Sequence, residues 1–279
     1  MYNKLKVCNM IKLEINEKGQ TLAPQTRKMG AEAFAQNSWC DIYWLGGGGA
    51  MLNCRGTILM IDPVLTGFDM PLLREAPIQP LEVPRVDGLL VTHIDNDHFS
   101  RKTCRELLLV CKTYHATHYV AGEMQKEGIG GIGHDIGASF EIGEVHITLT
   151  PVKHNWQNEF AEYGYREWKE EEYCGYWIEA YGKTIWIPGD SKLMEAHLQM
   201  PKPDVILFDF SEDTWHITLD GAVQLANTYP DSELICIHYG CIDAPDMRPF
   251  NGNPEKLFGR VVNPERIRVI APGERYRIR

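Results

Sequence analysis

The most constraining feature of this chain is a cluster of potential metal ligands that directly follows a short apolar run. The run Gly88–Val91 predicts a buried β-strand, and the polar segment Thr92–His98 (THIDNDH) predicts the loop after it. Imidazole and carboxylate groups together suit a divalent transition metal. His93, Asp95 and Asp97 alternate along the chain, so they would point to one side while His98 turns back. The segment therefore predicts ligands for two neighbouring metals rather than a solvated loop with incidental histidines.

Three further candidate ligands occur where other apolar segments stop. A single histidine or aspartate in such a place is usually a hydrogen-bonded polar residue, but the repetition of the pattern favours a shared site at one edge of the fold. The residues and the strands expected before them are His154 after Val145–Val152, Asp190 after Thr184–Ile187, and His238 at the end of Leu234–Ile237.

The rest of the chain alternates between short apolar strands and occasional helices, which favours two sheets with helices outside them. We expect a single domain over residues 1–279 in which residues 1–36 are peripheral. The glycine run Gly46–Gly49 lacks nucleotide-loop spacing and favours a tight turn or a close backbone approach. The other expected strands are Ile42–Leu45, Thr57–Ile61, Thr117–Val120, Ser139–Ile142, Tyr176–Tyr181, Val205–Phe208, Ile267–Ile270 and Tyr276–Ile278, and the expected helices are Lys102–Val110, Ala121–Glu127 and Leu219–Thr228.

Composition excludes several classes of function. Hydrophobic residues make up 44% and charged residues 24% of the chain, which is ordinary for a globular protein. The chain has no apolar run of the roughly 18 residues that a membrane span needs, and its start is too polar for a signal peptide, so we expect a cytoplasmic protein without membrane contact. The net charge of −10 argues against a nucleic-acid partner. We expect a small-molecule substrate, and the sequence leaves a homo-oligomer open.

The spacing of these ligands resembles the pattern of the metallo-β-lactamase superfamily, H-x-H-x-D-H followed by a lone His, an Asp after Gly and a late His. The similarity extends from Asp41 to the C-terminus, and Asp62 is similar to an early aspartate of the family. The resemblance implies the α/β fold class, as a four-layer αβ/βα sandwich with metals at one edge between the sheets. The branch that it suggests is similar to ascorbate-6-phosphate lactonases or phosphodiesterases.

The resemblance also implies two divalent metal ions and their ligands. Zinc is the first candidate, with manganese or iron as alternatives. Asp95 stands where the family pattern has its second histidine, and a harder carboxylate ligand tolerates manganese or iron better than imidazole does. The implied ligands are His93, Asp95 and His154 for the first metal, Asp97, His98 and His238 for the second, and Asp190 as the bridge.

Two such metals, about 3.5–4 Å apart, hold a bridging hydroxide that attacks a carbonyl carbon or a phosphorus. Asp97 would orient this nucleophile. His216 precedes the expected helix Leu219–Thr228, in a stretch that resembles family phosphodiesterases, and would protonate the leaving group with Glu212 or Asp213 orienting it. The alternative is that His216 is only a residue at a helix start, hydrogen-bonded to backbone.

The segment 155–173 is rich in aromatic residues and in glutamates. It is either a lid or wall that contacts substrate, or an amphipathic helix laid on the core. We expect Trp156, Trp168 and Tyr239 to bind substrate.

These observations favour a metal-dependent hydrolase acting on a small ester, lactone or phosphodiester. One alternative is a diiron redox enzyme on the same scaffold, because related flavo-diiron proteins carry a carboxylate where Asp95 stands. Another is a lipid hydrolase, because His154–Trp156 resembles the phospholipase D branch over a few residues. A non-catalytic binding protein is the third, although such a protein would not need the full ligand set.

Overall fold

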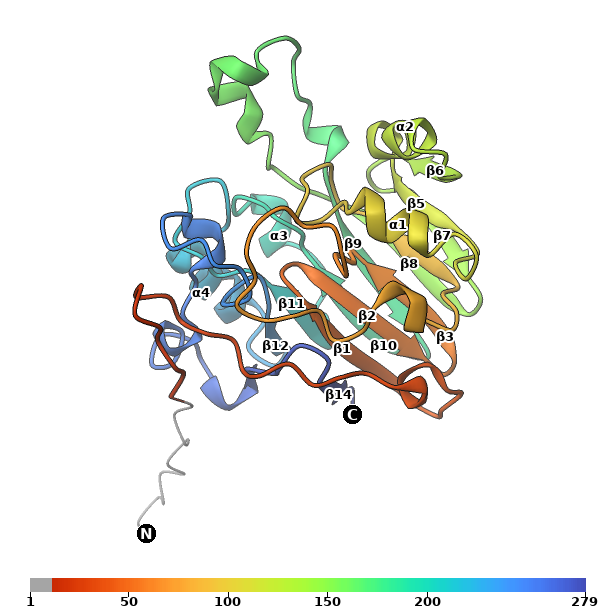
Figure 1. The fold of residues 1–279 in the computed structure, drawn as a ribbon. Coiled ribbons are helices and arrows are strands. Elements are labelled where there is room, and N and C mark those ends of the chain that lie inside the picture. Colours follow the sequence, from red (N-terminus) through yellow and green to blue (C-terminus); the bar gives the residue numbers. More distant parts are fainter. Residues whose placement is uncertain (1–11) are drawn as a thin grey trace.

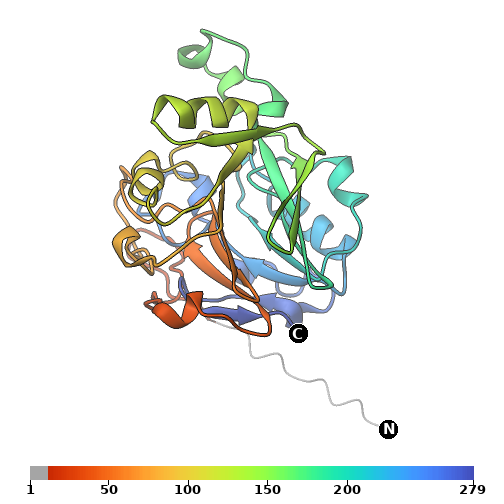
Figure 2. The ribbon, with the colours of Figure 1, turned by 90° about the vertical axis from the view of Figure 1, so that its right-hand side faces the viewer.

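Two seven-stranded β-sheets form the centre of the computed structural model, which describes residues 12–279. The first sheet has the order β14-β1-β2-β3-β4-β5-β6, and the second has the order β13-β12-β11-β10-β9-β8-β7. The sheets face each other, with α1 and α2 outside the first and α3 and α4 outside the second (Figures 1 and 2). This architecture confirms the four-layer αβ/βα sandwich expected from the sequence.

The strands of each sheet are as follows. The first sheet contains β1 (Cys40–Gly46), β2 (Gly49–Cys54), β3 (Thr57–Ile61), β4 (Gly88–Leu90), β5 (Tyr114–Thr117), β6 (Gly131–His134) and β14 (Arg275–Arg277). The second contains β7 (Ser139–Ile142), β8 (Val145–Pro151), β9 (Cys174–Ala180), β10 (Lys183–Ile187), β11 (Val205–Phe208), β12 (Glu233–Cys236) and β13 (Ile267–Arg268).

The helices are short. The α-helices are α1 (Arg101–Glu106), α2 (His118–Lys126), α3 (Glu195–Leu198) and α4 (Leu219–Thr228). The 3₁₀ helices are η1 (Ala31–Phe34), η2 (Pro80–Glu82), η3 (Trp156–Glu159), η4 (Ala161–Tyr163), η5 (Glu170–Glu172), η6 (Arg248–Phe250), η7 (Pro254–Lys256) and η8 (Pro264–Arg266). Among the described residues, none of these helices is both long and apolar enough to span a membrane.

The first sheet is buried on both faces, which explains its nearly continuous apolar strands. Along β1, Ile42 and Trp44 pack into the core between the sheets, whereas Tyr43 and Leu45 pack into the layer shared with α1 and α2. This alternation follows from the two-residue repeat of a β-strand. The result is a rigid scaffold whose strand ends can hold side chains in fixed places.

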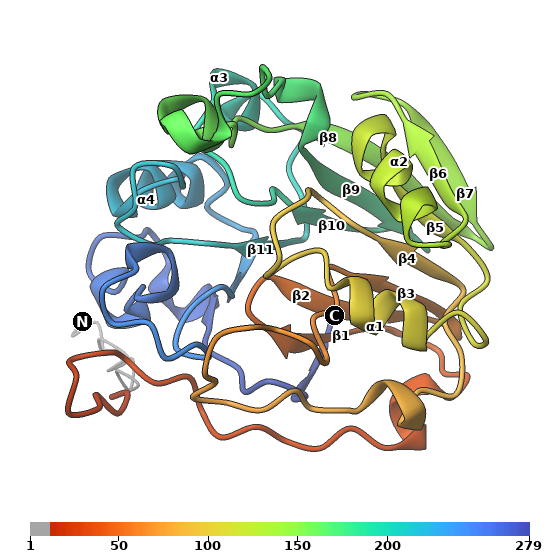
Figure 3. The ribbon, with the colours of Figure 1, turned by 45° about the horizontal axis from the view of Figure 1, so that its top comes forward.

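Parallel pairing brings the ends of several strands to one edge. Strands β3 to β6 pair in parallel, as do β10 to β13, so their carboxyl ends lie on the same side of each sheet. Figure 3 looks onto the molecule with this side turned forward. The loops after these strands therefore converge between the two sheets.

One expected strand is wrong. Thr117–Val120 was predicted as a strand before a helix, but β5 ends at Thr117 and α2 begins at His118. The Thr117 hydroxyl accepts a hydrogen bond from the Val120 backbone N–H at 3.5 Å and so caps the helix. A β-branched residue at the end of an apolar run acts here as an N-cap, which apolar patterning alone does not reveal.

Candidate metal centre

The seven expected ligands converge at the shared edge because each lies just beyond a strand end. The loops that carry them begin at residues buried in the core, so their backbones are well anchored. The ligands and their strands are His93, Asp95, Asp97 and His98 after β4, His154 after β8, Asp190 after β10, and His238 after β12.

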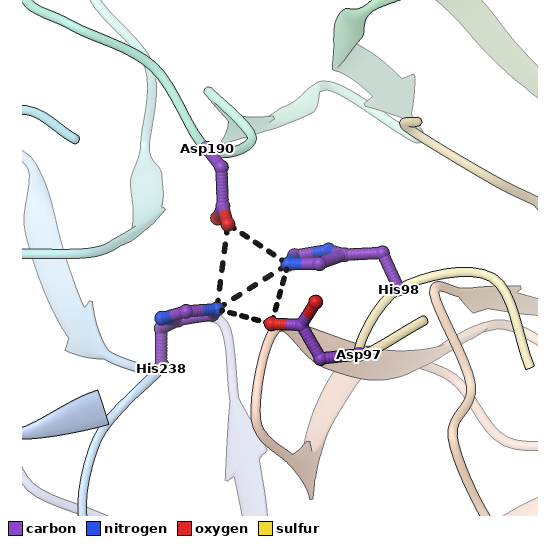
Figure 4. Close-up of side chains that lie close together, drawn as sticks. All are labelled: Asp97, His98, Asp190 and His238. Carbon is purple, nitrogen blue, oxygen red and sulfur yellow. Dashed lines mark hydrogen bonds and ion pairs between the residues drawn. The ribbon is translucent and has the colours of Figure 1, made fainter. Parts of the chain in front are cut away.

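The first group of close side chains contains Asp97, His98, Asp190 and His238 (Figure 4). His98 Nε2 lies 3.0 Å from Asp190 Oδ2 and 3.3 Å from His238 Nε2. Asp97 Oδ2 lies 3.3 Å from His238 Nε2 and 3.6 Å from His98 Nε2. Four potential ligand atoms from three loops thus face one another across a few ångströms, as a metal site requires.

A second group contains His93, His154 and again Asp190. Asp95 joins it, because its Oδ2 lies 3.4 Å from the Nε2 atoms of both His93 and His154. His93 Nε2 is buried and has no hydrogen-bond partner among the described residues. A buried polar atom without a partner is costly, and a metal ion would satisfy this one. Asp190 belongs to both groups, the place expected of a bridging ligand.

Hydrogen bonds behind the cluster hold the imidazole rings in place. Asp62 Oδ2 lies 2.8 Å from His98 Nδ1, and His154 Nδ1 donates to the Trp215 carbonyl at 3.0 Å. His93 Nδ1 lies 2.9 Å from the Thr92 hydroxyl, which donates to Asp62 at 2.6 Å. Such contacts point the Nε2 atoms inward and are typical of metal-binding histidines.

The electrostatics of the cluster keep its carboxylates ionised. Burial alone would raise the pKa of Asp190, but the adjacent His238, His98 and His216 hold that pKa well below its usual range. Burial would lower the pKa of His98, but Asp190 and Asp97 raise it well above its usual value. The carboxylates are therefore available as charged ligands, which is the form that binds metal.

His216 lies at the edge of the cluster, with its Nε2 3.7 Å from Asp190 Oδ2. Its Nδ1 lies 2.5 Å from Asp209 Oδ2, and Asp209 is in turn fixed by the backbone N–H groups of Phe210 and Ser211. Burial lowers the pKa of His216, but Asp190 and Asp209 together raise it to about 9. The ring is thus held with one nitrogen anchored and the other directed at the cluster.

The expected role of Glu212 is wrong. Glu212 lies at the surface and pairs with Lys256 at 2.6 Å, and Asp213 Oδ1 accepts from the Trp215 backbone N–H instead of contacting His216. Asp209 orients His216 in their place. It follows strand β11 directly, the same signal that identified Asp190 and His238, so the sequence did contain a pointer to it.

A cavity of about 770 Å³ opens beside the cluster. Asp95, Asp97, His154, Asp190 and His216 contribute to its wall, so the candidate ligands are accessible from it. Most other lining residues are apolar or aromatic. The aromatic ones are Trp156, Phe160, Tyr163, Trp168, Trp215 and Phe250.

Two of the three expected substrate-binding residues lie at this cavity. Trp156 and Trp168 line it, and both belong to the segment 155–173, which is made of 3₁₀ turns and loop rather than one amphipathic helix. The segment projects beyond the sheets (Figure 1). The expectation for Tyr239 is wrong, because this residue does not line the cavity. Its ring stacks on that of Trp44, with 5.4 Å between the ring centroids, in the core between the sheets.

The glycine run makes both a tight turn and a close approach to the centre. Gly46 and Gly47 have positive φ angles of 96° and 52°, which suit the turn between β1 and β2. A Cβ atom added to Gly48 would lie 2.3 Å from His98 Cε1. The absence of a side chain at Gly48 therefore leaves room for the His98 ring, a role that the sequence did not assign to this one glycine.

Alanine at position 48 is expected to displace the His98 ring and weaken metal binding at least about 10-fold, while the far-ultraviolet circular dichroism stays native. Metal affinity measured by chelator competition tests this expectation. Gly47→Ala is the matched control: it adds about 1–2 kcal/mol of backbone strain but meets no atom within 4 Å. Equal metal affinities in the two variants would contradict the assigned role of Gly48.

Comparisons with known proteins find relatives of this chain. A family model described as a β-lactamase superfamily domain matches residues 57–239. A metal-dependent hydrolase of the UPF0173 group from Methanosphaera stadtmanae is 28% identical over 239 residues, which are 80% of this chain and 92% of the relative. Another from Ruegeria is 29% identical over 161 residues, 55% of this chain and 64% of the relative.

Solved structures show the same fold. The metallo hydrolase Igni18 from Ignicoccus hospitalis has a TM-score of 0.66 at 18% identity, covering 87% of this chain and 99% of that one. At such low identity the likeness concerns the fold alone.

Proposed function

This chain belongs to the metallo-β-lactamase superfamily of metal-dependent hydrolases, and we propose that it binds two metal ions and hydrolyses a small ester, lactone or phosphodiester. The family assignment confirms the resemblance inferred from the ligand spacing. Three possible ligand groups lie among the described residues, and the third joins Asp209, His216 and His238. The observation that carries the proposal is that the other two share Asp190 beside a cavity.

The donor set fits two divalent ions. His93, Asp95 and His154 would hold one of them, and the partnerless His93 Nε2 supports this assignment. The other would be held by the Figure 4 group, with Asp190 common to both. Zinc suits the imidazole-rich set, and the additional carboxylate of Asp95 extends the range to manganese and iron.

The metals would supply an activated water and polarise the bond under attack. The protein's own part is to place substrate and protons. Hydrolysis adds the oxygen of water to the carbonyl carbon or phosphorus and breaks the bond to the leaving oxygen, which needs a proton. We assign this proton to His216 Nε2, because Asp209 anchors the opposite nitrogen. Asp97, which lines the cavity beside His238, is assigned to orient the attacking water.

The size and lining of the cavity support a small substrate. A volume of about 770 Å³ falls in the range of small-molecule sites, and the aromatic wall suits a substrate with an apolar part. The acidic net charge gives no support to a nucleic-acid substrate. We therefore propose a small-molecule substrate. We also propose, from the sequence resemblance alone, a lactonase-like or phosphodiesterase-like activity, and we keep the cytoplasmic location expected from the sequence as a proposal.

Elemental analysis of protein purified without chelators tests the proposal, followed by assays on bis-p-nitrophenyl phosphate, p-nitrophenyl acetate and γ-butyrolactone. We expect about two zinc or manganese ions per chain and hydrolysis of at least one substrate. Two tightly bound irons without hydrolysis would instead favour the diiron redox alternative, which the Asp95 carboxylate makes chemically reasonable. Less than one metal ion per chain, unchanged by added metal, would overturn the proposal.

A further inference from the structure

The wall of the cavity is hydrogen-bonded directly to one candidate metal ligand. Trp156 Nε1 donates to Asp95 Oδ2 at 2.8 Å, and Gln157 Nε2 donates to Asp95 Oδ1 at 3.0 Å. Both donors belong to η3, at the start of the aromatic segment 155–173. Each carboxylate oxygen of Asp95 is thus held by a different side chain.

A further hydrogen bond fixes the orientation of the Gln157 side-chain amide. The Tyr173 hydroxyl donates to Gln157 Oε1 at 2.6 Å, so the amide nitrogen must face Asp95. Gln157 is 2% and Tyr173 1% exposed, which leaves neither group free to turn toward solvent. The Tyr173 ring lies 5.8 Å from the His93 ring, measured between centroids, so the same tyrosine packs against a second ligand.

This arrangement requires a carboxylate at position 95. A carboxylate accepts hydrogen bonds on both oxygens and keeps lone pairs for a metal ion. An imidazole bound to a metal through one nitrogen carries a hydrogen on the other and accepts nothing. Trp156 and Gln157 would then lose their acceptor, so these two donors match the departure of Asp95 from the histidine of the family pattern.

We propose that Trp156 and Gln157 are positioning residues for the Asp95 ligand, and that metal binding there and ordering of the cavity wall reinforce each other. The proposal rests on the proposed metal site. Trp156 links the two events, because its ring also packs edge-on against Phe160 at 5.7 Å and Tyr163 at 5.1 Å between centroids. Coupling of this kind is reciprocal. Ordering of the cavity wall raises the affinity for the metal, and binding of the metal orders the wall.

Zinc affinity measured by chelator competition gives the first test. Gln157→Leu keeps the side-chain size but removes the amide, and Trp156→Phe keeps an aromatic ring but removes the N–H. Each variant is expected to bind one of the two zinc ions about 10- to 100-fold more weakly and to bind the other with unchanged affinity. Glu159→Gln is the matched control. Glu159 lies exposed in the same η3, and its side chain makes none of the hydrogen bonds or ion pairs found among the described residues.

Hydrogen exchange gives a second readout that a merely structural role would not move. Zinc alone should slow exchange in residues 155–163 about 10-fold in the unaltered protein. It should fail to do so in Gln157→Leu, although the backbone around His238 is still protected in that variant. A third readout is the double variant that carries both Asp95→His and Gln157→Leu. Its loss of zinc-binding free energy should be smaller than the sum of the losses in the two single variants.

The outcomes separate this inference from the proposed function. An unaltered protein that binds no metal would overturn both. An unaltered protein with two metals, together with unweakened zinc binding in Gln157→Leu, would overturn only the positioning role. An equal loss in Glu159→Gln would do the same, because it would show that any change in η3, and not the contact to Asp95, controls affinity.

Discussion

Replacing Asp190 by asparagine is expected to lower hydrolysis at least about 100-fold and to release bound metal. Asp190 Oδ2 lies 3.0 Å from His98, 3.4 Å from His238 and 3.7 Å from His216, each distance measured to Nε2. The neutral amide would remove the one carboxylate common to both ligand groups. The measurements are metal content per chain and kcat/KM on whichever substrate the initial assays identify.

Asp246→Asn provides the control for the Asp190 experiment. Asp246 lines the same cavity but belongs to neither ligand group, so its loss should leave the metal content unchanged. Circular dichroism should show that both variants are folded. An Asp190→Asn protein that retains two metals and full activity would refute the bridging assignment.

Removing the imidazole of His216 should also have a large effect on hydrolysis. His216→Gln is expected to reduce kcat about 10²- to 10⁴-fold, the usual contribution of a general acid, while metal content stays unchanged. The loss should be smaller for substrates that release p-nitrophenolate, because a good leaving group needs little protonation. Rates on activated and unactivated esters or phosphodiesters therefore measure the role directly.

Two acidic residues close to His216 in the sequence give variants for comparison, one expected to lose activity and one expected to keep it. Asp209→Asn should reduce kcat about 10- to 100-fold, because it loosens the ring without removing it. Glu212→Gln should match the unaltered protein, since Glu212 is engaged with Lys256 at the surface. An equal loss for both substrate classes in His216→Gln would show that the histidine is not the proton donor.

The candidate ligands could be predicted from sequence because their signal is local. Each is a histidine or aspartate at the point where a short apolar strand ends, and the strands Thr57–Ile61 and Val205–Phe208 have the bounds that were predicted. Parallel pairing brings the ends of β10 and β12 to one edge of their sheet. The antiparallel β9 lies between β8 and β10 and gives β8 the same direction as β10, and packing of the two sheets adds the loop after β4. The same reasoning extends to the helix Leu219–Thr228, whose N-cap, Thr218, accepts from the Gly221 backbone N–H.

The residues that sequence reasoning misplaced are those whose role depends on a distant partner. Glu212 is four residues from His216, yet the chain between them directs it to Lys256 instead. Tyr239 follows a ligand directly, but the positive φ of His238, 62°, accompanies a turn in which the tyrosine ring enters the core. Proximity in sequence therefore did not predict proximity in the site.

By itself, the sequence indicated which residues could bind metal, because strand periodicity and ligand chemistry act over a few residues. The kind of sandwich that presents them was implied by the resemblance to a known family and not by periodicity. Only the tertiary structure decided which side chains support those ligands. The hydrogen bonds of Trp156 and Gln157 to Asp95 and the close approach of Gly48 to His98 join loops from different strands. Asp209 and His216 lie in one loop, after β11, whose course brings them together. The contacts to Asp95 depend on how the two sheets pack, and the contact of Gly48 with His98 depends on the strand order within the first sheet. Both are long-range properties that no local pattern encodes.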